Sequence, residues 1–286
     1  LTVKLQGDDS IWRNGLVIDR AGGSVAMPRT PFGANLLING DFSVNQRSFS
    51  GGALAAGAYG VDRWKADASG ASLTISGDVV TLSTGAVIQI VEACLGPWGH
   101  VCFSVEDLAG GALAVTIAGV TQTLTPASDR GGVAFDLTGV ASSSNVEVKL
   151  APAAGAVGFK RAKLESGASF SAWLPRSRAQ ELALCQRYFQ LHRGGLSMVA
   201  PMAGQANGYG ALPIAMRATP TPLMIGGAQL TWPAIGAATV TTANLASLAM
   251  RDAGVFAIAF GSGSPATAAG QAGFLHDANL FFSAEF

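Results

Sequence analysis

The feature that most constrains the fold is a series of eight short runs of β-branched and apolar residues between residues 73 and 150. Gly, Asp, Ser or Pro separates each run from the next, at a spacing of roughly 8–12 residues, which is typical of an all-β sandwich or barrel. Ser76–Asp78 and Ala118–Gly119 read as hairpin turns. We therefore expect one antiparallel β-sandwich. The eight runs are Leu73–Ser76, Val79–Leu82, Val87–Val91, Val101–Val105, Leu113–Ile117, Gln122–Thr125, Val133–Leu137 and Val146–Leu150.

A helix is predicted directly after the sandwich. Pro175 ends an extended segment, and Ser177 with Gln180 fits a capping box, in which each residue satisfies a free amide of the other. Leu182, Cys185 and Phe189 recur at helical spacing. Cys185 lies on this apolar stripe and is expected to be a small buried hydrophobe.

The two ends of the chain are predicted to form separate structural units. Short strand-like runs between residues 197 and 286 predict a smaller C-terminal β-domain. At the N-terminus a strand is expected at Gly15–Arg20, a turn at Ala21–Ser24 and an extended stretch at Met27–Pro31. The expected division is an N-terminal attachment segment 1–33, a sandwich 34–174, a linking helix 175–193 and a C-terminal β-domain 194–286.

Charge is sparse and balanced. Lys and Arg number 18, Asp and Glu number 18, and charged residues make up 13% of the chain. A nucleic-acid surface or a polybasic membrane patch needs clustered cations, so neither partner is expected. No segment approaches the roughly 20 apolar residues of a membrane-spanning helix. The low charge and the 37 glycines fit either a surface hidden in an oligomer or the composition of a GC-rich genome.

Signatures of catalysis are weak. The cysteines Cys94, Cys102 and Cys185 form no CxxC pair, so neither a disulfide framework nor a zinc site is expected. The three histidines stand singly, and no nucleophile elbow or phosphate-binding loop occurs. Glycan hydrolysis needs two carboxylates facing one another across a cleft, and no spacing selects such a pair. The carboxylates of the sandwich considered for that role are Glu92, Glu106, Asp107, Glu147 and Glu165.

Stretches in both halves of the chain carry a family resemblance. Asn35–Phe42, with Gln46-Arg47 and Tyr59–Trp64, looks like the opening strand of a carbohydrate-binding-like jelly roll. Leu164–Phe189 resembles the junction between that jelly roll and a small C-terminal β-domain in bacteriophage tail-fibre and virion receptor-binding proteins. Leu212–Thr221 and Asp277–Leu280 resemble the C-terminal domain of such fibres.

The resemblance implies a non-enzymatic fibre or spike of a virion, or of a virion-like particle such as a gene transfer agent. The jelly roll would bind a host-surface polysaccharide, and segment 1–33 would attach to other virion proteins. A homo-oligomer, a trimer or higher, is expected because multivalency multiplies weak glycan contacts. The N-terminus shows no secretory signal, so assembly in the bacterial cytoplasm is expected. The alternatives are a purely structural fibre or adaptor protein and a glycan-degrading virion enzyme.

Sugar rings stack on aromatic side chains, so aromatic residues at expected loop positions are the candidates for glycan binding. Tyr59, Trp98, Tyr209 and Trp232 meet that description, and Trp98 and Tyr209 have nearby glycines that suit exposed loop tips. Partial burial or an interface contact is an equally good reading of each. Trp64 and Trp173 are expected in the sandwich core or at the domain joint, and Asp62-Arg63 as a structural ion pair or turn. Trp98→Ala is accordingly expected to weaken host binding without melting the fold.

The jelly-roll resemblance also implies a structural calcium ion. Asn39, Asp41 and Glu165 supply the matching oxygens. Ser43 stands where such modules tend to carry a carboxylate, and calcium needs six to eight oxygen ligands. The loss of one carboxylate weakens the case for this ion.

Overall fold

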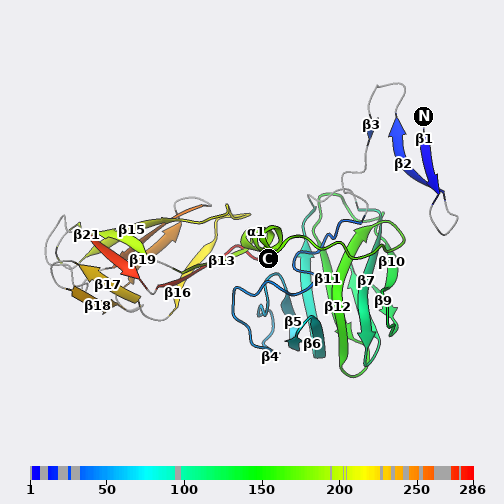
Figure 1. Ribbon diagram of the computed structural model, residues 1–286, viewed down its shortest axis with the longest axis horizontal. Coiled ribbons are helices and arrows are strands. Elements are labelled where there is room, and N and C mark those ends of the chain that lie inside the picture. Colours follow the sequence, from blue (N-terminus) through cyan, green and yellow to red (C-terminus); the bar gives the residue numbers. More distant parts are fainter. Residues whose placement is uncertain are drawn as a thin grey trace.

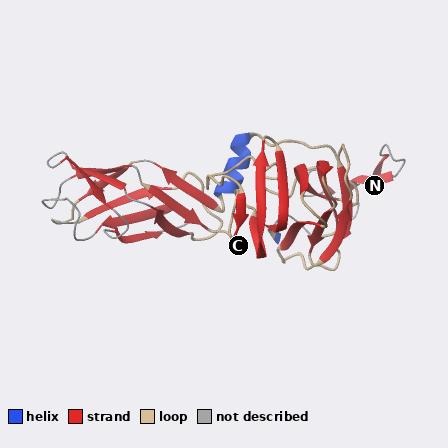
Figure 2. Ribbon diagram, turned by 90° about the horizontal axis from the view of Figure 1, so that it is seen from below, coloured by secondary structure: helices blue, strands red, loops and turns tan. Residues whose placement is uncertain are grey.

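A computed structural model describes an elongated molecule in which two β-stranded domains flank a short helix (Figures 1 and 2). The expected all-β class, an antiparallel sandwich followed by a linking helix and a smaller β-domain, is confirmed. Within the described ranges, no helix is long and apolar enough to cross a bilayer. The structure describes residues 2–6, 12–18, 25–26, 33–93, 98–193, 195–201, 203, 205–225, 228–232, 236–240, 245–250, 254–260, 272–276 and 278–286, with backbone only at 2–26, 228–240, 246 and 276.

The first domain is a nine-stranded antiparallel sheet that folds over on itself. Its strand order is β10-β7-β12-β6-β11-β8-β9, with β5 beside β6 and β4 beside β5. The hairpin turns expected at Ser76–Asp78 and Ala118–Gly119 join β5 to β6 and β8 to β9. The strands are β4 (Gly52–Leu54), β5 (Lys65–Ser76), β6 (Val79–Val91), β7 (His100–Ala109), β8 (Leu113–Ile117), β9 (Val120–Leu124), β10 (Gly131–Asp136), β11 (Val146–Pro152) and β12 (Val157–Ser166).

Two long strands, β5 and β6, pass from one layer of the sandwich to the other. The first part of β6 pairs with β12, and its last part, Val87–Val91, pairs with β11. At the bend Gly85 has a φ of +69°, and a Cβ there would collide with the main-chain oxygen of Gly70 on β5. Only glycine allows both the left-handed conformation and this close approach of the two strands.

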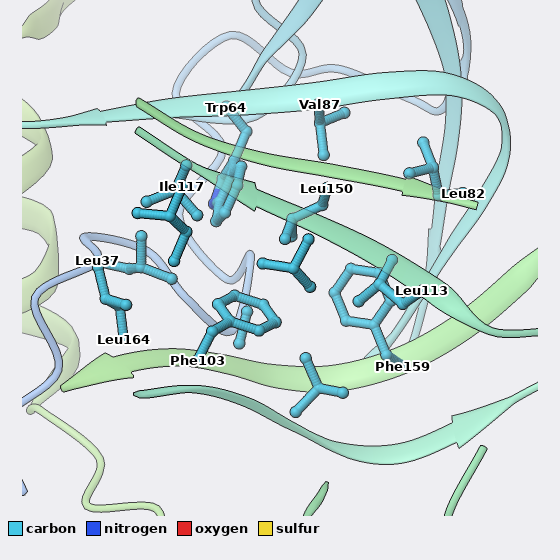
Figure 3. Close-up of a cluster of buried hydrophobic side chains, with 14 of the residues drawn as sticks. Leu37, Trp64, Leu82, Val87, Phe103, Leu113, Ile117, Leu150, Phe159 and Leu164 are labelled. Carbon is cyan, nitrogen blue, oxygen red and sulfur yellow. The ribbon is translucent and has the colours of Figure 1, made fainter. Parts of the chain in front are cut away.

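The core of the first domain lies between these layers. Alternate residues of the strands point inward, as period-two patterning requires. Figure 3 shows the indole of Trp64 among inward-pointing aliphatic and aromatic side chains. The Phe42 ring stacks on Trp64 at 4.6 Å between centroids, which anchors the loop that contains Phe42 to the core. Each fully buried Leu or Phe contributes about 1.5–3 kcal/mol of transfer free energy. Fully buried members include Leu37, Leu73, Leu82, Phe103, Val115, Leu150, Phe159 and Leu164.

The linking helix, α1 (Arg178–Gln186), has the expected capping box. The Gln180 N–H donates to Ser177 Oγ at 3.3 Å, and the Ser177 N–H donates to Gln180 Oε1 at 3.1 Å. Cys185 is fully buried, as expected. The helix is shorter than the expected range 175–193, because the chain from Phe189 onward pairs with β22 as a strand. The prediction that Phe189 continues the helical stripe is therefore wrong.

The C-terminal domain packs two antiparallel sheets face to face. One has the strand order β13-β22-β16, and the other has the order β18-β17-β21-β14-β15-β20-β19. Phe256 and Phe282, one from each sheet, meet at 4.7 Å between ring centroids in the shared core. The strands are β13 (Phe189–Arg193), β14 (Leu196–Val199), β15 (Ala206–Ala211), β16 (Thr221–Ile225), β17 (Ala228–Trp232), β18 (Gly236–Val240), β19 (Leu245–Met250), β20 (Val255–Phe260), β21 (Ala272–His276) and β22 (Asn279–Ser283).

The N-terminal segment contributes a separate three-stranded sheet, β1 (Thr2–Gln6), β2 (Trp12–Ile18) and β3 (Val25–Ala26). The strand expected at Gly15–Arg20 overlaps β2. The expected turn at Ala21–Ser24 and the expected stretch Met27–Pro31 both lie outside the described residues. Cys94 also lies outside them.

Candidate functional site

A pocket of about 500 Å³ opens on the surface of the first domain. Ligand sites for small molecules and sugars are typically concave and about 300–1,000 Å³ in volume, so this pocket falls within that range. Four segments build it: the loop before Val44, the β5–β6 turn, the middle of β12 and the segment that leads to α1. Its lining residues are Asp41, Phe42, Ser43, Gly77, Asp78, Arg161, Trp173 and Pro175.

The loop Asp41–Ser43 is held rigidly. The buried side chain of Asn39 donates to the main-chain oxygens of Val44 and Asp62, and its Oδ1 accepts the N–H of Val44. Asp41 Oδ1 accepts the Ser43 hydroxyl at 2.9 Å. The loop is thus fixed before any ligand arrives, which lowers the entropy cost of binding.

Charged side chains form the second wall. Asp78, at the β5–β6 turn, lies 3.3 Å from the ammonium of Lys160 on β12, and Lys160 lies equally close to Asp107. The side chain of Asp78 is more than half exposed. Its carboxylate therefore keeps free acceptor capacity toward the pocket.

Arg161 is aimed into the pocket by an irregularity in the sheet. The register between β12 and β7 shifts twice, and the non-glycine residues Arg161 and Asp107 have φ values of +52° and +53° at those shifts. Such bulges redirect single side chains and are over-represented next to functional sites.

The Arg161 guanidinium is held in turn by Glu106. Glu106 accepts hydrogen bonds from Arg161 and from Arg130, each at 2.7 Å. Burial would raise the pKa of Glu106, but the hydrogen bonds from Arg130 and Arg161 lower it below its usual value. Glu106 is therefore ionised at neutral pH and fixes both cations.

Trp173 forms the aromatic wall. The segment that contains it is pinned by a buried ion pair between Lys163 and Glu165, 3.1 Å apart. Lys163 donates to Ser171 Oγ and to the Ala172 main-chain oxygen, while Glu165 accepts the Ser171 N–H and hydroxyl. The Arg130 guanidinium lies 5.8 Å from the centroid of the Trp173 ring.

This arrangement suits recognition of a hydroxylated ring. The half-buried indole of Trp173 offers apolar ring surface, Asp41 and Asp78 offer acceptors, and Arg161 offers donors. Stacking on an aromatic face combined with a few fixed polar groups is the pattern of small polar-ligand sites.

The aromatic residues selected from the sequence are not brought together. Trp98 is only 8% exposed and belongs to the first core, and its indole donates to the Ser144 main-chain oxygen at 2.8 Å. The expectation that Trp98 stands exposed at a loop tip is therefore wrong, because the ring is packed in the core. Tyr59 is half-buried at the domain joint, with its hydroxyl 3.2 Å from the Phe286 main-chain oxygen. Tyr209 is 63% exposed on β15, and Trp232, with its side chain outside the description, is the last residue of β17.

The three residues expected to bind calcium, Asn39, Asp41 and Glu165, each have other partners in the structure. Both carboxylate oxygens of Glu165 accept hydrogen bonds from Ser171, and the Lys163 ammonium lies 3.1 Å from the carboxylate. The side-chain amide of Asn39 donates both its N–H groups to main-chain oxygens, and its Oδ1 accepts the Val44 N–H. In the part of the chain that the structure covers, no three His, Cys, Asp or Glu side chains group closely enough for a metal ion. Glu165 instead positions the Trp173 segment.

A second polar cluster lies at the joint between the domains. Glu285 pairs with Arg63 at 2.6 Å and with Arg47 at 3.4 Å, and all three side chains are largely buried. The Phe286 main-chain oxygen accepts from Tyr59 and from Lys65. These contacts tie the end of the C-terminal domain to the first domain.

Asp62 and Arg63 have separate partners. Asp62 accepts the N–H and side-chain amide of Gln46 and lies 3.6 Å from Arg47. Burial raises the pKa of Asp62, although Arg47 and Gln46 oppose the shift. Asp62 and Arg63 were expected as a structural ion pair or turn, and they lie in a turn, across which the Trp64 N–H donates to the Val61 main-chain oxygen at 3.1 Å. Their side chains do not pair with one another, because each is directed to a different segment.

No protein-family model matches the chain, and a search of curated proteins finds no match. Sequence reasoning missed Trp173, Asp78 and Arg161 as a site. Trp173 was expected in the core or the joint, since its neighbours Leu174 and Pro175 give no sign of a pocket. The bulge that directs Arg161 depends on pairing with β7 and leaves no local signal.

Proposed function

We propose that the protein is a non-enzymatic fibre or spike component of a virion or virion-like particle, such as a gene transfer agent, and that it binds a host cell-surface polysaccharide. The sugar would occupy the Trp173 pocket of the first domain. The single observation that supports this most is that the half-buried indole of Trp173 lines one pocket together with Asp41, Asp78 and Arg161.

In the same proposal, segment 1–33 attaches the chain to other virion proteins, and the particle is assembled in the bacterial cytoplasm. The protein acts as a homo-oligomer, so weak single-site contacts add up on one cell surface. The elongated shape, with one β-domain on each side of the joint, supports a fibre or spike (Figure 1).

The test is binding of host-surface oligosaccharides to the wild-type chain and to Trp173→Ala, by glycan array followed by titration calorimetry. We expect the variant to lose about tenfold or more in affinity, which corresponds to about 1.4 kcal/mol or more. The thermal midpoint should change little, because Trp173 is only half-buried. Phe170→Ala is the matched control, since Phe170 is an exposed aromatic nearby that does not line the pocket.

Three outcomes contradict the proposal. Absence of any glycan binding by the wild-type chain supports the purely structural alternative. Equal binding by wild type and Trp173→Ala moves the site elsewhere. If the wild-type chain releases cleaved oligosaccharide and Asp41→Asn or Asp78→Asn abolishes that release, the protein is a glycan-degrading enzyme, since those carboxylates line the same pocket.

A further inference from the structure

The charges that line the Trp173 pocket are unevenly divided. Asp41 and Asp78 contribute carboxylates from two different segments, and Arg161 is the one cation among the described residues that line it. A charge that a neighbour already opposes attracts or repels a ligand less than an unopposed charge does. The partner of each group therefore decides which ligands the pocket accepts.

The positive charge of Arg161 is already opposed. Its guanidinium donates to Glu106 at 2.7 Å, and its side chain is 44% exposed. Glu106 also accepts a hydrogen bond from Arg130, so two guanidinium groups share one carboxylate. An arginine that binds an acid group strongly does so through two parallel N–H donors. Because one terminal nitrogen of Arg161 is committed to Glu106, Arg161 suits a hydroxyl acceptor better than a second acid group.

The negative charge of Asp78 is only partly opposed. Its carboxylate lies 3.3 Å from the Lys160 ammonium, but Lys160 lies at the same distance from Asp107. Two carboxylates thus share one ammonium, which is the reverse of the arrangement at Glu106. The Asp78 side chain is 57% exposed and that of Lys160 is 24% exposed. A ligand in the pocket therefore meets the carboxylate rather than the ammonium.

Asp41 is held by uncharged groups. Its Oδ1 accepts the N–H of Ser43 at 3.3 Å and the Ser43 hydroxyl at 2.9 Å. These hydrogen bonds fix the carboxylate without neutralising it. The surplus of positive charge at Glu106 and the surplus of negative charge at Lys160 offset one another, so Asp41 leaves the surroundings of the pocket with an excess of negative charge.

The chain as a whole adds no bias of its own. Lys and Arg number 18, and Asp and Glu number 18, so the formal net charge is zero. At physiological ionic strength the Debye length is about 8 Å, so distant exposed charges are largely screened. Any preference among charged ligands is therefore expected to come from the groups at the pocket.

We propose that the pocket recognises a sugar residue that presents hydroxyl or amino donors and carries no acid group. This inference rests on the proposed glycan binding and names the class of sugar. Hydroxyl groups donate to Asp41 and Asp78, and an amino group is attracted in addition to both carboxylates and to the face of Trp173. A carboxylate or sulfate in the same place approaches two like charges, while Arg161 is already opposed by Glu106. Repulsion therefore selects against acidic polysaccharides.

The size and the salt dependence of this selection follow from Coulomb's law. Two like unit charges about 4 Å apart near a protein surface weaken binding by about tenfold or more. In about 1 M salt the Debye length falls to about 3 Å, so the penalty on an acidic sugar should shrink. A preference that came from the shape of the pocket alone would not change with salt in this way.

The test is titration calorimetry of the full chain with host-surface oligosaccharides in matched forms. Each acidic oligosaccharide is compared with the form in which its carboxylates are reduced to alcohols, and each neutral one with the form in which its primary alcohols are oxidised to carboxylates. Ring type, linkage and length then stay constant. We expect the uncharged form to bind about tenfold or more tightly in about 0.1 M salt, and this ratio to fall in about 1 M salt.

Asp41→Asn/Asp78→Asn should bring the ratio of the two affinities close to one, because asparagine keeps the shape and an acceptor oxygen but removes the charge. Asp136→Asn is the matched control. Asp136 lies on β10 with a side chain 60% exposed, close to the exposure of Asp78, and it does not line the pocket. This control should keep the wild-type ratio.

The outcomes separate this inference from the function on which it rests. Equal or tighter binding of the acidic form by the wild type overturns the inference and leaves glycan binding standing, and loss of that binding in Arg161→Gln would assign the pocket to acidic sugars. A folded double variant that keeps the wild-type ratio also overturns the inference. Absence of binding by either form overturns glycan binding itself. Circular dichroism checks folding, and if the double variant does not fold, the wild-type ratio and its salt dependence still decide.

Discussion

At the scale of single residues, Trp98 and Trp173 differ in what satisfies the indole N–H. Trp98 donates to the Ser144 main-chain oxygen inside the first core. Trp173 lies half-buried against the pocket, with the Arg130 guanidinium 5.8 Å from its ring centroid. The first ring therefore contributes to stability, and the second is available to a ligand.

Trp98→Ala is expected to lower the free energy of unfolding by about 3–5 kcal/mol, the usual result of deleting a large buried ring. Urea denaturation followed by circular dichroism measures this change. Trp173→Ala in the same experiment should stay within about 1 kcal/mol of wild type, because a half-exposed ring loses less apolar burial. A Trp98→Ala variant as stable as wild type would contradict the burial described above.

Single-residue roles were predictable where local pattern decides them. Cys185 was placed on an apolar stripe, and Trp64 was placed in the core or the joint; both are fully buried. The role of Trp173 was not predictable, since it depends on the buried pair Lys163–Glu165 that fixes its segment. A pair of opposite charges two residues apart in a strand says nothing by itself about what it anchors.

At the scale of elements, the bend of β5 and β6 turns one sheet into a sandwich. The sequence showed Val79–Leu82 and Val87–Val91 as two runs, and Gly85 between them read as a break. In the structure both runs belong to β6, and Gly85 is the point where the strand changes layer. Periodicity identifies strand segments, but it does not tell a glycine that ends a strand from one that bends it.

Gly85→Ala should destabilise the first domain far more than Gly77→Ala. Both glycines have positive φ, so both variants lose about 1–2 kcal/mol from the left-handed conformation. Only the Gly85 Cβ meets the neighbouring strand, at Gly70, whereas nothing lies near Gly77. This clash adds about 1–3 kcal/mol. Thermal unfolding of the two variants measures the difference, and equal losses would argue against the bend.

At the scale of the whole molecule, the two β-domains are joined by contacts as well as by the chain. Arg63 and Glu285 form a nearly dry pair across the joint, and the Arg63 guanidinium lies 3.5 Å from the Tyr188 ring centroid. The all-β class and the helix between two domains were predictable from the sequence. The joint was not, because its partners lie more than 200 residues apart.

Glu285→Ala should uncouple the domains. Removing one member of a buried pair leaves Arg63 uncompensated and costs about 3–5 kcal/mol. Differential scanning calorimetry is expected to show two separate unfolding transitions in place of a more cooperative one. Glu147→Ala, at an exposed position of β11, is the matched control and should leave the trace unchanged. An unaltered trace for Glu285→Ala would show that the joint is weak.

The joint has a mechanical consequence. The chain leaves the first domain at Tyr188 and Phe189, and the segment Ala284–Phe286 returns to the same place, where the Ala284 N–H donates to the Tyr188 main-chain oxygen at 2.7 Å. A domain held at one point swivels freely, but one held at two points transmits torque. The direction in which the Trp173 pocket faces is therefore set by the orientation of the C-terminal domain. In an assembly built on that domain, each pocket would therefore keep a fixed orientation relative to the assembly.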